Sequence, residues 1–76
     1  MNESLSSIVD EVIIENEATI PHEEIADVRH AVLEVFSVKC NPSTPIEELE
    51  KQFGTREKLK FCIGEAVDIV KEQILF

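Results

Sequence analysis

The side chains with the greatest capacity for chemistry in this chain are two histidines, two cysteines and sixteen carboxylates. Asp27 and His30 have the i, i+3 spacing with which helices present metal ligands, but a bundle site of that kind needs a second such pair, which the sequence lacks. His22, His30, Cys40 and Cys62 could together supply four zinc ligands, yet no C-x-x-C or H-x-x-x-H spacing supports such a site. The sequence therefore predicts neither a metal nor a cofactor.

Acid–base catalysis by carboxyl groups requires two of them in different environments around a cleft. Here the acids fall at positions that face away from the apolar residues, which is typical of a solvated surface. The chain also contains no glycine-rich phosphate loop and no G-x-S-x-G nucleophile motif. We therefore expect a protein that is not an enzyme and has no catalytic residue.

The first 28 residues hold eight carboxylates and no lysine or arginine. If these acids served only solubility, bases would be interspersed among them, as they are in residues 45–60. An unbroken acidic run is repulsive, and a basic partner would offset that repulsion. Helical carboxylates three or four residues apart lie about 5 to 6 Å from each other, which is of the order of the phosphate spacing on a DNA strand. The predicted partner-binding face comprises these acids and one apolar residue that projects among them: Glu3, Asp10, Glu11, Ile14, Glu15, Glu17, Glu23, Glu24 and Asp27.

In size, charge and lack of catalytic motifs, the chain resembles the small acidic inhibitors, DNA mimics among them, that phages encode against host proteins. The resemblance implies a non-enzymatic protein that docks on a basic surface of a protein partner, such as a DNA- or RNA-binding face, and blocks it. Two other uses of the acidic face stay open. It could serve solubility alone, or it could meet the basic Lys51 to Lys60 segment of a second copy. We expect the chain to form a homodimer, in which Phe61, Ile69 and Phe76 would supply apolar contact.

The segment LEKQFGTREKLKFCI, residues 49–63, carries the alternative function. A short helix, a glycine turn, a capping threonine and a second amphipathic helix resemble a helix-turn-helix, which places its second helix in the DNA major groove. The predicted basic site comprises Lys51, Arg56, Lys58 and Lys60. However, a net charge of −9 opposes approach to a polyanion, so direct nucleic-acid binding is the weaker hypothesis. A helical adaptor or a dimerisation module would use the same two helices and the turn between them.

Helical periodicity of the apolar residues predicts the elements that position these side chains. It indicates helices over residues 3–15 and 22–38, a short third helix over residues 45–53 and a fourth after Thr55. Thr44, Pro45 and Glu47 form the pattern of a capped helix start, and Gly54 that of a helix stop. A competing prediction is a small β-hairpin near residues 11–20, because β-branched residues cluster there.

The predicted fold is therefore all-α: one acidic domain, residues 1–76, built as a compact bundle of about four helices. No apolar run approaches the roughly 20 residues of a membrane helix, and no secretory signal is evident, so we expect a soluble cytoplasmic protein with free cysteines. The second and fourth helices are expected to form the core, through Ile25, Val28, Val32, Val35, Phe36, Leu59, Ile63, Ala66 and Val70.

Overall fold

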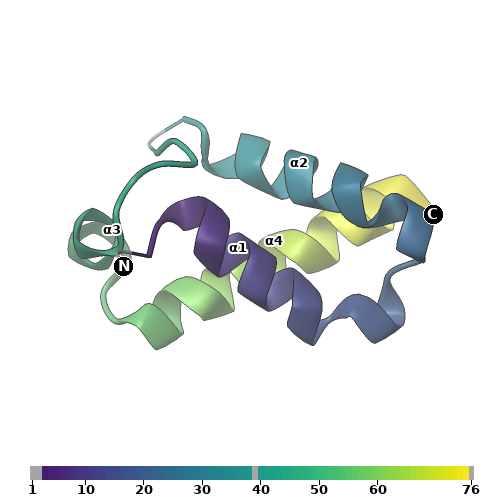
Figure 1. Cartoon of the computed structure of the whole chain (residues 1–76), viewed down its shortest axis with the longest axis horizontal. Coiled ribbons are helices and arrows are strands. Elements are labelled where there is room, and N and C mark those ends of the chain that lie inside the picture. Colours follow the sequence, from purple (N-terminus) through teal and green to yellow (C-terminus); the bar gives the residue numbers. More distant parts are fainter. Residues whose placement is uncertain (1–2, 39, 76) are drawn as a thin grey trace.

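Four α-helices and two short 3₁₀ helices build the computed structural model of this chain, which describes residues 3–38 and 40–75 (Figure 1). Helices α1, α2 and α4 pack against one another, and α3 lies at one end of the molecule against α4 (Figure 1). The all-α bundle predicted from periodicity is confirmed. The bounds are α1 Leu5–Glu15, η1 Glu17–Thr19, η2 His22–Glu24, α2 Ile25–Phe36, α3 Ile46–Phe53 and α4 Arg56–Leu75.

The β-hairpin considered for residues 11–20 is wrong, because this stretch forms the end of α1 followed by η1. Val12 and Ile13 continue an apolar face that Leu5 and Ile8 begin, and all four side chains are buried. Burial of that helical face outweighs the β preference of the branched residues. Asn16 then ends the helix, since its side-chain amide donates a hydrogen bond to the carbonyl of Val12 at 2.8 Å.

The first turns of α1 and α3 cap each other through the backbone. The Leu5 N–H donates to the carbonyl of Thr44 at 3.0 Å, and the Ile46 N–H donates to the carbonyl of Glu3 at 2.9 Å. Helix N-termini leave N–H groups without intrahelical partners, so each segment satisfies a donor of the other helix. This exchange fixes Glu3, a predicted site residue, beside the start of α3.

The capping box predicted at Thr44 and Glu47 does not form. Pro45 occupies the N-cap position of α3, and no side chain caps that helix. The hydroxyl of Thr44 instead accepts a hydrogen bond from the Asn41 N–H at 2.9 Å, which closes the preceding turn. Local hydrogen bonding within that turn has competed successfully with the helix cap.

The predicted boundary between the third and fourth helices is confirmed. Gly54 ends α3 with a φ of 94°, a conformation that L side chains rarely adopt. The Lys58 N–H donates to the hydroxyl of Thr55 at 3.2 Å, so Thr55 caps α4 as expected.

Most of the predicted core residues are buried, but the core is not formed by α2 and α4 alone. Val35 is 55% exposed, because α2 buries only Val28 and Val32 completely and ends at Phe36, while Ile25 and Phe36 are half-buried. Helix α1 packs against both α2 and α4 and carries a larger share of the core than expected. The buried apolar residues are Leu5, Ile8, Val9, Val12, Ile13, Ile20, Val28, Val32, Cys40, Leu49, Leu59, Ile63, Ala66, Val67 and Val70.

Candidate functional site

Arg56, the first residue of α4, binds two carboxylates of the predicted acidic face. Its Nε and Nη2 donate to Glu3 at 2.9 and 2.8 Å, and Nη2 also donates to Glu11 on α1. The planar guanidinium suits this double contact, since its donors match the two oxygens of a carboxylate. The hydrogen bond from Arg56 lowers the pKa of Glu3, and the bonds to Glu3 and Glu11 raise the pKa of Arg56 further above its ordinary value.

Lys60, one turn further along α4, continues the same network. Its Nζ lies 2.8 Å from the carboxylate of Glu15 and 4.0 Å from that of Glu11. The hydrogen bond to Glu15 raises the pKa of Lys60. On the other flank of α1, Asp10 pairs with Arg29 of α2. Four of the predicted partner-binding acids, the three on α1 and Glu3 before it, therefore face cations of this same chain.

The same contacts occupy half of the predicted basic site. Arg56 and Lys60 are engaged with α1, and Lys51 lies 3.6 Å from Glu48 within α3. Lys58 is exposed at the start of α4. The structure thus pairs residues of the predicted acidic face with residues of the predicted basic site within one chain. From the sequence, such pairing was considered only between two copies of the chain.

The remaining predicted acids are Glu17, Glu23, Glu24 and Asp27, on η1, η2 and the first turn of α2. None of them takes part in an ion pair among the residues that the structure describes. We call these four residues the acidic turn. The segments that carry it lie at the end of the bundle opposite α3 (Figure 1). Because none of these four acids has an ion-pair partner among the described residues, the negative charge there is the least compensated of the predicted face.

A hollow of about 390 Å³ lies at the acidic turn. Its apolar side chains come from the turn and from the start of α2, and one carboxylate borders them. A lysine or arginine side chain combines an aliphatic stem with a cationic head, so it could lay the stem on these apolar groups and point the head at the acid. The lining residues are Glu17, Ala18, Ile20, His22 and Ile25. Ile14, the apolar member of the predicted face, is 64% exposed on α1.

The histidines and cysteines do not converge. Within residues 3–38 and 40–75, no three His, Cys, Asp or Glu side chains are grouped so as to hold a metal ion. His30 turns toward Glu34 on its own helix, with 2.9 Å between Nε2 and Oε1, rather than toward Asp27. Cys40 is buried with its Sγ 3.8 Å from the side-chain oxygen of Gln52, and both cysteines are free thiols.

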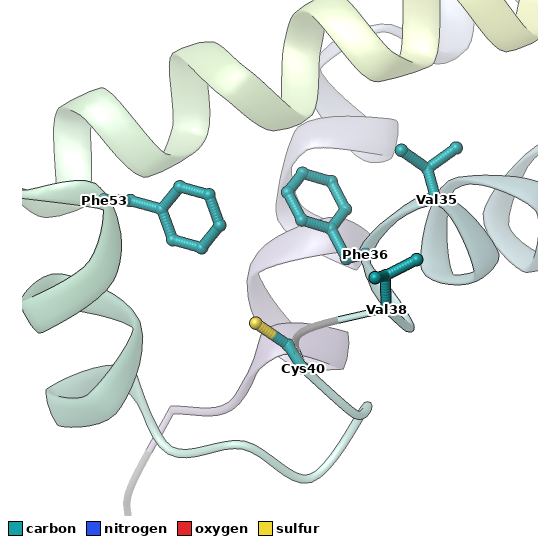
Figure 2. A pocket seen from close by; sticks show the side chains of 5 residues that line it. All are labelled: Val35, Phe36, Val38, Cys40 and Phe53. Carbon is teal, nitrogen blue, oxygen red and sulfur yellow. The ribbon is translucent and has the colours of Figure 1, made fainter.

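An apolar hollow of about 220 Å³, which the sequence did not predict, opens where α2 ends. Phe36 and Phe53 face each other across it at 5.8 Å between ring centroids, and the sulfur of Cys40 points into the space between them (Figure 2). Val35 and Val38 form its outer wall and are 55% and 87% exposed. The sequence feature that could have indicated this hollow is the apolar pattern of residues 25–38, which covers more of the helix surface than one buried face.

Comparison with models of protein families, with curated proteins and with solved structures gives no match for this chain. Across the described part of the chain, no helix combines the length and the apolar character that crossing a membrane requires.

Proposed function

We propose that this protein is a non-enzymatic acidic binding protein that docks on a basic surface of a protein partner, the DNA- or RNA-binding face of that partner, and blocks it. The observation that carries the proposal is the acidic turn, whose four carboxylates form no ion pair among the described residues and whose Glu17 borders an apolar hollow. Lys71 reaches this turn but donates to the hydroxyl of Thr19, at 2.7 Å. A basic protein surface would supply both the missing charge and the aliphatic stems that fit the hollow.

The distribution of charge supports this direction of binding. In the folded chain, Arg29, Arg56 and Lys60 form ion pairs with carboxylates of α1 and of the segment before it. The net charge of the chain remains −9. An uncompensated anionic surface accelerates encounter with a cationic partner and orients it. It also repels DNA, which favours a protein that replaces nucleic acid over one that binds it.

Two observations weigh against the other classes of function. Each charged side chain among the described residues is at least partly exposed, and the resolved pKa shifts arise in surface ion pairs rather than in a cleft. A helix-turn-helix would need Arg56 and Lys60 for phosphate contacts, and both are engaged with α1.

The proposal is tested by passing lysate of the source or host over the immobilised protein at low salt, eluting with a salt step, and adding duplex DNA as competitor. We expect a basic nucleic-acid-binding protein that duplex DNA displaces. Reversing the charge of Glu17 and Glu23 to lysine should weaken its capture about tenfold or more, because close charge pairs at interfaces contribute more than 1.4 kcal/mol.

The matched control reverses Glu47 and Glu50 on α3, at the other end of the bundle, which changes the net charge of the chain equally. Equal loss of capture in both variants would reduce the interaction to nonspecific charge attraction. Recovery of DNA alone would contradict the proposal and direct attention to Lys51 and Lys58.

A further inference from the structure

The α2–α4 side of the bundle exposes a set of large apolar side chains. Val35 and Val38 are 55% and 87% exposed at the end of α2, and Phe61 and Ile69 are 68% and 55% exposed on α4. Scattered exposed apolar residues are normal on a protein surface, so the question is whether these four adjoin one another.

Ion pairs with α1 fix which flank of each helix faces away from it. Arg29 on α2 and Lys60 on α4 both reach carboxylates of α1, so their flanks face that helix. Val35 follows Arg29 by six residues and Ile69 follows Lys60 by nine, which at 3.6 residues per turn places Val35 about 120° from Arg29 and Ile69 about 180° from Lys60. On each helix the buried residues lie between the two positions, so Val35 and Ile69 are at the edge of the buried face that is turned away from α1. Both therefore border the seam where α2 and α4 lie side by side in opposite directions (Figure 1).

Two hollows open at the end of this seam and share the ring of Phe53. One is the 220 Å³ hollow behind Val35 and Val38 (Figure 2). The other, of about 420 Å³, includes Phe61 and Cys62 of α4 among its lining residues. We group these two hollows with the exposed side chains of Val35, Val38, Phe61 and Ile69 and call this surface the seam groove.

Carboxylates follow the seam groove on both sides. On α4, Glu65, Asp68 and Glu72 follow Phe61 in one exposed row, because their spacings are four, three and four residues, and this row lies on the solvent side of Ile69. On α2, Asp27 and Glu34 are seven residues apart and lie on the solvent side of Val35.

The cationic contribution at this groove is small. Among the described residues that line the two hollows, Lys58 is the basic one, beside Glu57. The apolar strip therefore has negatively charged margins on both helices.

We propose that the seam groove binds an amphipathic helix of the partner, one with an apolar face and with lysine or arginine along both margins. An apolar strip between acidic margins is complementary to such a helix in both hydrophobicity and charge. A second copy of this chain fits less well, because a two-fold contact on this face would place acidic margins against each other. The inference rests on the proposed function in requiring a cationic partner, and it specifies the partner's recognition element.

The test uses two synthetic peptides of leucine and lysine with identical composition. One has the residues in helical amphipathic order, and the other is scrambled so that no apolar face forms. Isothermal titration should show that the ordered peptide binds at least about tenfold more tightly, since burying one or two leucines contributes that much. In NMR spectra, the backbone amides whose chemical shifts change on peptide binding should lie on the flanks of α2 and α4 that face each other.

Three variants locate the contact. Val35→Ser and Ile69→Ser should each weaken binding of the ordered peptide about tenfold, because each removes an apolar contact from the seam groove. Ile14→Ser is the matched control, since Ile14 is 64% exposed but lies on α1, and its affinity should stay within about twofold of the unmodified protein. Circular dichroism checks that all three variants fold.

The inference fails, with charge-driven docking intact, if both peptides bind equally or if Ile14→Ser weakens binding as much as Ile69→Ser. If neither peptide binds, the inference also fails, while the proposed function is decided separately by partner capture and by the charge reversal of Glu17 and Glu23. Analytical sedimentation, which measures the oligomeric state, tests whether a second copy of the chain occupies the seam groove instead. A dimer that Val35→Ser and Ile69→Ser dissociate would overturn the inference in favour of a second copy.

Discussion

Arg56 is the residue whose position most changes the interpretation of this chain. The helix-turn-helix hypothesis made it a contact to DNA, and the acidic-face hypothesis left Glu3 and Glu11 for a partner. The structure pairs these three side chains with one another, at 2.8 Å for the bond from Nη2 to Glu3. The first hypothesis had assigned the charge of Arg56 to DNA, and the second had assigned the charges of Glu3 and Glu11 to a protein partner. In the fold these charges pair with one another.

The Glu3–Arg56 pair predicts a pH response. A carboxyl group with a lowered folded-state pKa stabilises the fold at pH values above its unfolded-state pKa, and that contribution disappears as the pH falls through the lowered value. In an NMR titration, Glu3 should therefore titrate below the ordinary pH range of a glutamate side chain. Arg56→Gln should return the Glu3 pKa to its ordinary range and weaken acid resistance. An unchanged Glu3 titration in that variant would contradict the pairing.

At the scale of elements, helix ends decide where the candidate residues lie. The glycine between α3 and α4 sets the angle at which α4 leaves, and so carries Arg56 and Lys60 toward α1. Gly54 has a φ of 94°, and a Cβ there would lie 3.1 Å from Cδ of Lys58. Gly64 is in the middle of α4, where an added Cβ would meet nothing within 4 Å.

These two glycines should respond oppositely to the same substitution. Gly54→Ala is expected to lower the free energy of unfolding by about 1 kcal/mol or more, because alanine is strained at positive φ. Gly64→Ala should raise it by about 0.5–1 kcal/mol, because alanine has less backbone freedom to lose on forming a helix. Urea unfolding measures both, and a stabilising Gly54→Ala would show that this helix end has another conformation.

At the scale of the whole molecule, folding rearranges both charge and apolar surface. A sequence with −8 on residues 1–28 and a near-neutral remainder becomes a bundle in which α1 is partly neutralised by α2 and α4. Helix α1 is held from the inside as well, since five of its residues are buried. Half of the carboxylates of the predicted acidic face therefore form ion pairs within the chain, and the acidic turn is the part for which we propose binding.

The central place of α1 predicts a contrast between two isoleucines on that helix. Ile8 is fully buried and Ile14 is 64% exposed. Ile8→Val should lower the free energy of unfolding by about 0.5–1.5 kcal/mol, because it removes a packed methyl group. Ile14→Val should change it by less than about 0.5 kcal/mol. Equal effects in urea unfolding would contradict this assignment of the buried face.

The fold was predictable to the extent that it depends on local pattern. The apolar spacing of Leu5, Ile8 and Val12 indicated the buried face of α1, and Gly54 with Thr55 marked the boundary of α4. The predictions of a Thr44 cap and of a buried Val35 were wrong, because each depends on what packs nearby. The Asn41 N–H donates to the hydroxyl of Thr44, and the packing of α2 leaves Val35 55% exposed.

By itself, the sequence determined the helices, their apolar faces and the excess of acid, because helix periodicity and charge are properties of neighbouring residues. Only the tertiary structure decided which carboxylates keep their charge uncompensated. Glu3 and Arg56 are 53 residues apart, and Glu15 and Lys60 are 45 apart, so their pairing depends on how α1 packs against α4. The same packing leaves the carboxylates of the acidic turn outside the ion pairs of the described residues, although Lys71 reaches the hydroxyl of Thr19 there. It also leaves the apolar side chains of the seam groove exposed, since three packed helices cannot bury every apolar flank that each of them carries.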